Sequence, residues 1–248
     1  MDQVHFTKAD CEILSEANSR KEDLPERGDI RDRLLVLDRA LPGQRFAGTA
    51  ILGLDLHKHW KPQNLTSASH PHAFNGNKVS EIFLRYGKSR QEMDDMDLDD
   101  IPKEDRRHRG FGSFPRHVHI AIGLSYEGFF YQVVIQPGAC PDHKAMIDRL
   151  RHEKTGPVLF EKIKMLQADG YQVFFDEPGH PGLDGFASAK ELGKLISERY
   201  RDSQGRFPFS IRKNVTVHDR VSVTSDNLSL EINRLFPLFE LIARTSTR

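Results

Sequence analysis

The stretch HVHIAIGLSYEGFFYQVVIQ, residues 117–136, decides the fold of this chain. It contains two apolar runs, 117–124 and 129–136, which are rich in β-branched and aromatic residues and are separated by a short turn. Runs of this length and composition around a turn predict an antiparallel β-hairpin. Pro137-Gly138 follows directly and should end the second strand.

Further strand and helix patterns lie on both sides of this hairpin. Strands are predicted over 46–56, 79–86, 171–176 and 207–217. Helical spacing and capping signals predict helices that begin at Thr7 and Asp29 and cover 142–152, 157–168, 189–200 and 228–242, with Pro237 kinking or interrupting the last. Strands grouped in the middle of a chain with helices at both ends favour an α+β fold with a central, largely antiparallel sheet.

Length and composition predict a single α+β domain over residues 1–248, with a polar acidic loop at about 93–105. The two cysteines form no paired motif, and the chain shows neither a signal peptide nor a long apolar stretch, so we expect a cytoplasmic protein without a membrane partner. The 36 basic and 36 acidic residues balance. This excludes a globally basic nucleic-acid binder but allows a local basic patch.

Several of the twelve histidines are paired in the sequence. His57 and His59 are two residues apart, as are His117 and His119, and residues at that spacing in a strand share one face. Imidazole pairs suit Zn²⁺, and Mn²⁺ or Mg²⁺ is the other candidate ion. With Asp55 or Asp176 nearby, these histidines would give a metal-dependent hydrolase. The alternative is that they are surface or strand-edge histidines with local hydrogen bonds.

A second group of residues interleaves cations with aromatic rings. Cations neutralise phosphates and aromatic rings stack on bases, so the group predicts contacts with DNA or RNA. Its members are Lys58, Trp60, Lys61, Arg85, Lys88, Arg106, Arg109, Phe111 and Arg116. The alternative is a solvated basic segment that balances the acidic run just before it.

Other catalytic patterns are not supported by the sequence. The spacing around His117 and His119 does not fit a cupin or a two-histidine phosphoesterase. The chain has no phosphate-binding glycine loop and no G-x-S-x-G motif. The single D-x-K, Asp142-His-Lys144, does not lie on a predicted strand, which argues against a restriction-type nuclease.

Residues 109–124 resemble a bacterial family. Arg109-Gly110-Phe111, Pro115, His117 and Ile122-Gly123-Leu124 follow the order of the YktB-like signature. Phe236-Pro-Leu-Phe239 in the last predicted helix and Lys58-His59 earlier in the chain are also similar to that family. Two extra residues stand between Pro115 and Ile122, so the matching histidine is open. The resemblance implies a compact α+β fold and no particular activity.

Three functional hypotheses follow from these patterns. The first is a nucleic-acid-binding or nucleic-acid-processing protein, and it is preferred because three separate segments are similar in character. The second is a metal-dependent hydrolase that uses the paired histidines. The third is a non-enzymatic interaction module without a site of its own.

Overall fold

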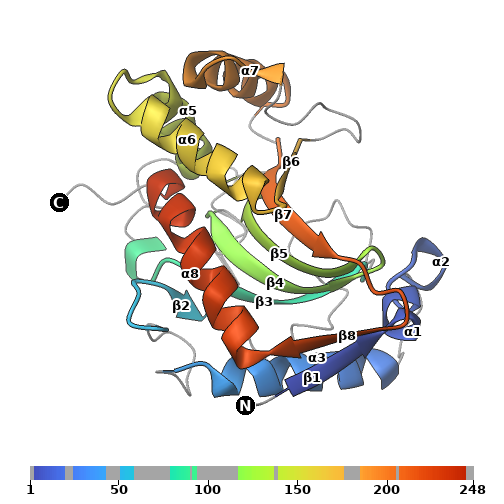
Figure 1. The fold of residues 1–248 in the computed structure, drawn as a ribbon. Helices are drawn as coiled ribbons and strands as arrows, with labels where there is room; N and C mark the ends of the chain where they lie inside the picture. The colour runs from blue at the N-terminus through green and yellow to red at the C-terminus, as the bar shows by residue number, and fades with distance from the viewer. Residues whose placement is uncertain are drawn as a thin grey trace. The chain divides into compact units, whose positions relative to one another are not determined.

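A computed structural model gives the fold and describes residues 3–19, 25–42, 51–58, 79–89, 91–93, 117–136, 139–175, 185–204 and 207–243. The helices in Figure 1 are α1 (Lys8–Glu12), α2 (Glu16–Ser19), α3 (Pro25–Ala40), α5 (Cys140–Arg151), α6 (Thr155–Ala168), α7 (Ala189–Asp202) and α8 (Ser225–Ile242). The strands are β1 (Gln3–Thr7), β2 (His57–Lys58), β3 (Glu81–Gly87), β4 (His119–Ser125), β5 (Gly128–Ile135), β6 (Gln172–Phe174), β7 (Phe209–Val215) and β8 (Arg220–Thr224).

Six of these strands form an antiparallel sheet in the order β2-β3-β4-β5-β7-β6. With helices at both ends of the chain, this confirms the predicted α+β fold. The predicted hairpin is β4–β5, and every residue of both strands is buried. Gly128 opens β5 with a φ of 135°, and a Cβ there would lie 2.4 Å from the Val215 carbonyl oxygen. A glycine is therefore required where the hairpin turns.

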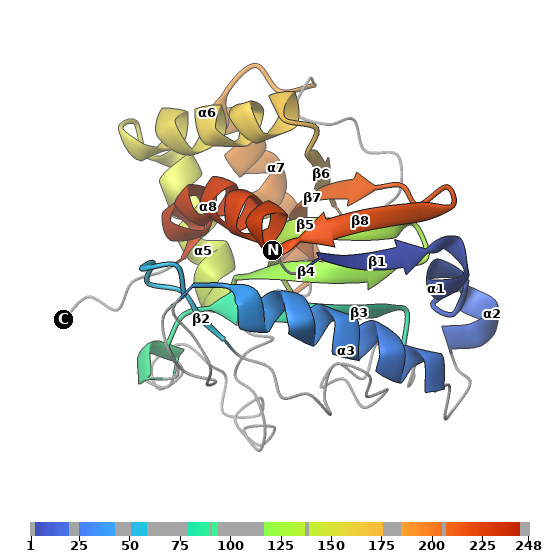
Figure 2. The same cartoon turned by 60° about the horizontal axis from the view of Figure 1, so that its bottom comes forward.

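Strands β1 and β8 form a separate two-stranded sheet that the sequence did not predict. They pair antiparallel, with Val4 opposite Val223, and α3 runs alongside β1 (Figure 2). The predicted cap at Thr7 is confirmed, because its side chain and the Asp10 carboxylate exchange hydrogen bonds with each other's backbone N–H. This capping box ends β1 and starts α1.

Two predicted elements differ from those observed. The strand predicted over 46–56 is wrong for 51–56, which form a turn with Leu52 and Gly53 at positive φ; residues 46–50 lie outside the described part of the chain. Ile51 and Leu56 are nevertheless buried, so the apolar pattern reflects burial rather than a strand. The last helix, α8, continues through Pro237 without interruption.

The chain forms two compact units, each made of three separate segments. Unit 1 contains Met1–Gly87, Ala121–Tyr131 and Asn214–Asn233, and unit 2 contains Lys88–Ile120, Gln132–Lys213 and Arg234–Arg248. In unit 1, Cys11 is a free buried cysteine, and burial together with neighbouring acidic charges raises the pKa of its thiol to about 11. No described helix has the length and apolar character that crossing a membrane requires.

Candidate functional site

The chain entering β2 alternates between exposed and buried positions. Leu56 and Lys58 are buried, Asp55 is exposed and His57 is partly exposed. The turn before β2 is closed by a hydrogen bond, in which the Ile51 N–H donates to the Leu56 carbonyl at 2.9 Å. This bond holds the residue that directly precedes β2. Successive residues of an extended segment point to opposite sides. Asp55 and His57 therefore share the outer side.

The buried side of β2 is held by an ion pair. The Lys58 ammonium donates to one oxygen of Asp38 on α3, and the Tyr86 hydroxyl of β3 donates to the other oxygen at 2.7 Å. Burial raises the pKa of Asp38, and the hydrogen bonds from Lys58 and Tyr86 oppose that rise. Burial also raises the pKa of Tyr86 well above its usual value. These contacts tie α3 to β2 and β3 and fix which side of β2 faces outward.

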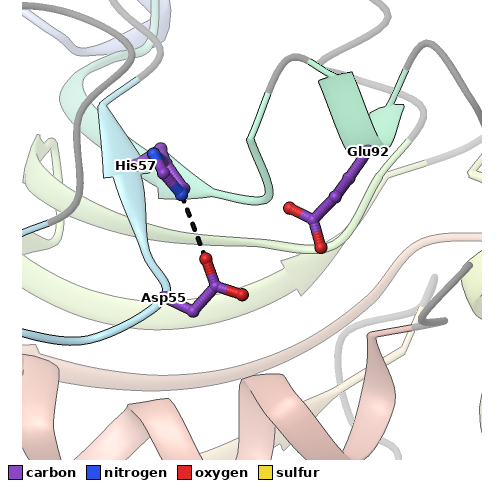
Figure 3. A group of neighbouring side chains, drawn as sticks. All are labelled: Asp55, His57 and Glu92. Carbon is purple, nitrogen blue, oxygen red and sulfur yellow. Dashed lines mark hydrogen bonds and ion pairs between the residues drawn. The ribbon is translucent and has the colours of Figure 1, made fainter.

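The outer side of β2 carries a hydrogen-bonded carboxylate and imidazole. His57 Nε2 and Asp55 Oδ1 are 3.1 Å apart, and the side chains are 15% and 73% exposed respectively (Figure 3). Two ligands on a tetrahedral ion with bonds of about 2.1 Å lie about 3.4 Å apart. The separation of this pair is therefore close to that of two ligands of one ion.

Strand β3 contributes residues to the same outer side. His57 pairs with Gly87 and Lys58 pairs with Tyr86 in the antiparallel register. Because Tyr86 points to the buried side, Gly87, Arg85 and Phe83 lie on the side of His57. The Arg85 guanidinium lies 4.7 Å from the centre of the Phe83 ring.

The Arg85 guanidinium remains a cation at neutral pH. Burial lowers its pKa to about 10, and the charge of Glu81 acts in the opposite direction. Arg85, Glu81 and Phe83 each keep part of their surface exposed. The outer side of β2 and β3 thus combines a possible ligand pair with a cation and an aromatic ring.

Unit 2 contains a second buried ion pair. Lys88 Nζ donates to Asp142 at 2.5 Å, and the Val118 N–H donates to the other oxygen of that carboxylate at 2.7 Å. Burial alone would raise the pKa of Asp142, but the Lys88 ammonium and His117 hold it well below its usual value. Asp142 lies in the first turn of α5, where the helix dipole also favours a negative charge.

One member of the second predicted histidine pair lies beside this carboxylate. His117 Nδ1 lies 3.6 Å from Asp142, and His119 Nδ1 lies 3.1 Å from the His117 carbonyl oxygen. Both histidines are buried. Metal binding by this pair stays a prediction. Glu92, also drawn in Figure 3, belongs to unit 2, where its carboxylate accepts two hydrogen bonds from Ser89 at 2.8 Å.

The structure describes three of the residues predicted to contact nucleic acid. Lys58 and Lys88 are buried in the ion pairs above, and Arg85 is partly exposed beside Phe83. The remaining residues of that prediction lie outside the described part of the chain: Trp60, Lys61, Arg106, Arg109, Phe111 and Arg116. His59, from the predicted metal set, also lies outside it. Contact with nucleic acid stays a prediction.

Sequence reasoning missed the two buried aspartates that organise these networks. Asp38 lies on the apolar stripe of α3, four residues after Leu34, and an acid at such a position was the available signal. Asp142 was predicted to start a helix and was tested as part of a nuclease motif, but not as a buried anchor. Its place after Pro141 at a helix start is the pattern that predicts a capping or anchoring carboxylate.

Comparison with known proteins assigns no family to this chain. No family model matches it, and no curated protein or solved structure shows significant similarity. The resemblance to the YktB-like family stays a prediction.

Proposed function

We propose that this protein is a metal-dependent hydrolase that binds a divalent cation through Asp55, His57 and His59. The observation that carries the proposal is the Asp55–His57 pair, whose ligand atoms are 3.1 Å apart on the outer side of β2. A carboxylate and an imidazole at this separation can share an ion when the proton between them is lost.

The third ligand is proposed from sequence spacing. Asp55 lies two residues before His57 in the sequence, and His59 lies two residues after it. A strand that continued to His59 would direct all three side chains to one face. One carboxylate and two imidazoles suit Zn²⁺ or Mn²⁺, and catalytic zinc sites use three protein ligands and keep a fourth position for water. A bound ion would supply Lewis acidity and a water of lowered pKa.

The buried side of β2 supports the proposed site. A ligand set works when the residues that carry it are held rigidly. Lys58 lies between the two histidines in the sequence, and its ion pair with Asp38 holds this segment against α3. The site would therefore be fixed from behind by a buried contact that no substrate needs to touch.

Metal binding is the first test. After chelator treatment, titration calorimetry with Zn²⁺ and with Mn²⁺ should show one bound ion per chain, and the ion should raise the melting temperature. Asp55→Asn and His57→Gln should each weaken binding by about ten-fold or more. His218→Gln, a change at an exposed histidine elsewhere in unit 1, is the matched control and should bind like the wild type.

Hydrolysis is the second test, with p-nitrophenyl acetate and bis(p-nitrophenyl) phosphate as probes. Activity should depend on the added ion and fall in Asp55→Asn and His57→Gln but not in His218→Gln. A wild-type protein that binds neither ion would overturn the proposal and favour a non-enzymatic interaction module.

A further inference from the structure

The outer side of β2 and β3 carries more than the proposed ligands. Arg85 and Phe83 lie there with His57, because the register places Gly87 opposite His57 and alternate residues of β3 share a face. All of these residues belong to unit 1. A cation and an aromatic ring are thus built into the same face as the proposed metal ligands.

Arg85 lies on the same face of the ladder as His57, with its guanidinium over the Phe83 ring. It lies two residues from Gly87 and is therefore a diagonal neighbour of His57 across the ladder. Diagonal neighbours on one face are about 7–8 Å apart, which a long side chain can span.

Phe83 is held firmly beside Arg85. Its ring lies 6.1 Å from that of Phe130 on β5 and 4.7 Å from the Arg85 guanidinium. Behind it, β4 approaches closely at Gly123, where a Cβ would lie 2.5 Å from the Phe83 Cβ. The Phe83 ring is therefore packed between its neighbours, and the residue keeps part of its surface exposed.

We infer that the substrate is a phosphodiester of single-stranded nucleic acid, with Arg85 binding the phosphate and Phe83 stacking against a neighbouring base. This inference rests on the proposed hydrolase. A guanidinium matches phosphate oxygens in a two-point hydrogen bond, and charge complementarity favours an anionic substrate over a neutral ester. An aromatic ring stacks on any base, so the preference is for the single-stranded form rather than for a sequence.

The reaction consumes one water molecule. The water oxygen forms a bond to phosphorus, one phosphorus–oxygen ester bond breaks, and the leaving oxygen takes up a proton. The products are a phosphate monoester and an alcohol. Arg85 would bind the non-bridging oxygens throughout, and Asp55 and His57 would hold the ion.

The test measures binding of fluorescein-labelled short single-stranded DNA and RNA by anisotropy, and their cleavage with Zn²⁺ or Mn²⁺. Arg85→Met should weaken binding by about ten-fold. It should also reduce the slope of the logarithm of the binding constant against the logarithm of the salt concentration by about one, which corresponds to one counterion. Arg85→Lys should recover part of the affinity, since it keeps the charge. Phe83→Leu should weaken binding by about five-fold or more. Arg220→Met, at an exposed arginine of β8 in the same unit, should bind as the wild type does.

The outcomes separate this inference from the hydrolase proposal. Ion binding and p-nitrophenyl acetate hydrolysis without binding or cleavage of either nucleic acid would overturn the inference and leave the hydrolase standing. Loss of ion binding would overturn both. Should Arg85→Met fail to fold, the wild type still decides: salt-independent binding, or binding that duplex DNA competes for as well as single strands, contradicts the inference.

Discussion

At the scale of single residues, two buried ion pairs hold chain segments that are distant in sequence. Lys58–Asp38 in unit 1 and Lys88–Asp142 in unit 2 each join a lysine near the sheet to an aspartate on a helix. Burying a charge is costly unless a partner and hydrogen bonds satisfy it. Tyr86 and the Val118 N–H supply those additional hydrogen bonds.

Breaking one partner of the first pair should cost more than removing both. Lys58→Met alone should lower the free energy of unfolding by about 3–5 kcal/mol, because it leaves the Asp38 carboxylate buried without its cation. Adding Asp38→Leu should recover much of that loss. Urea denaturation of the four proteins in the cycle measures this coupling.

An exposed ion pair provides the control for this cycle. On α7, Lys194 is exposed, Glu198 is partly exposed, and their charged groups are 4.0 Å apart. Lys194→Met should change stability by less than about 0.5 kcal/mol. Equal losses at Lys58 and Lys194 would contradict the role assigned to burial.

His143 should make stability depend on pH below neutrality. Burial lowers the pKa of its imidazole to about 4, and the centre of the imidazole lies 5.4 Å from that of the Tyr200 ring and 6.0 Å from that of the Phe207 ring. The unfolded chain, with an ordinary pKa near 6.5, binds the proton more readily, so stability present above about pH 6.5 is lost as pH falls towards 4. The loss should approach about 3 kcal/mol.

The difference between wild type and His143→Leu isolates this contribution. Urea denaturation of both proteins from pH 7.5 to 4 should show that the wild type loses more stability than the variant as the pH falls, since the variant has no imidazole to protonate at this position. Parallel curves would show that the pKa of His143 is the same in the folded and unfolded protein, which contradicts this prediction.

At the scale of elements, two helical glycines have opposite expected effects. A Cβ at Gly156 would lie 2.4 Å from the Leu150 carbonyl oxygen, whereas one at Gly28 would meet nothing closer than 3.9 Å. Gly156→Ala should destabilise the protein by about 1–3 kcal/mol through overpacking. Gly28→Ala, in α3, should stabilise it by about 0.5–1 kcal/mol. Thermal and urea unfolding of the two variants check both signs.

Elements with local signals were predictable from the sequence, and those that depend on distant partners were not. Thr7 and Ser188 are the N-caps of α1 and α7, and both side chains accept the expected N–H hydrogen bonds. Strand β1 escaped prediction because its partner, β8, lies more than 200 residues away in the chain. Its formation depends on tertiary pairing rather than on local propensity.

The candidate site was only partly visible in the sequence for the same reason. The spacing of His57 and His59 drew attention to His57, and Asp55 was one of two acids expected nearby. The register that puts Arg85 on their face, and the burial of Lys58 on the opposite face, follow from strand pairing and from Asp38 on α3. A run of basic residues in the sequence cannot distinguish a cation that faces outward from one that is buried in an ion pair.

At the scale of the whole molecule, neither unit is a continuous stretch of chain. Unit 1 needs the β4–β5 turn and residues 214–233 as well as the first 87 residues. A fragment of residues 1–93 would lack β8, the partner of β1, and β4, the neighbour of β3. We expect this fragment to be unfolded, as measured by far-ultraviolet circular dichroism and by poorly dispersed amide resonances. A folded fragment would contradict the division.

The buried thiol of Cys11 can report how often unit 1 opens locally. A buried thiol with a raised pKa does not react with alkylating reagents, because the thiolate is the reactive form. In a Cys140→Ser background, the labelling rate would therefore report how often the first helix of unit 1 exposes its buried side. Repeating the measurement with and without a divalent cation would show whether ion binding at Asp55 and His57 slows breathing elsewhere in the same unit.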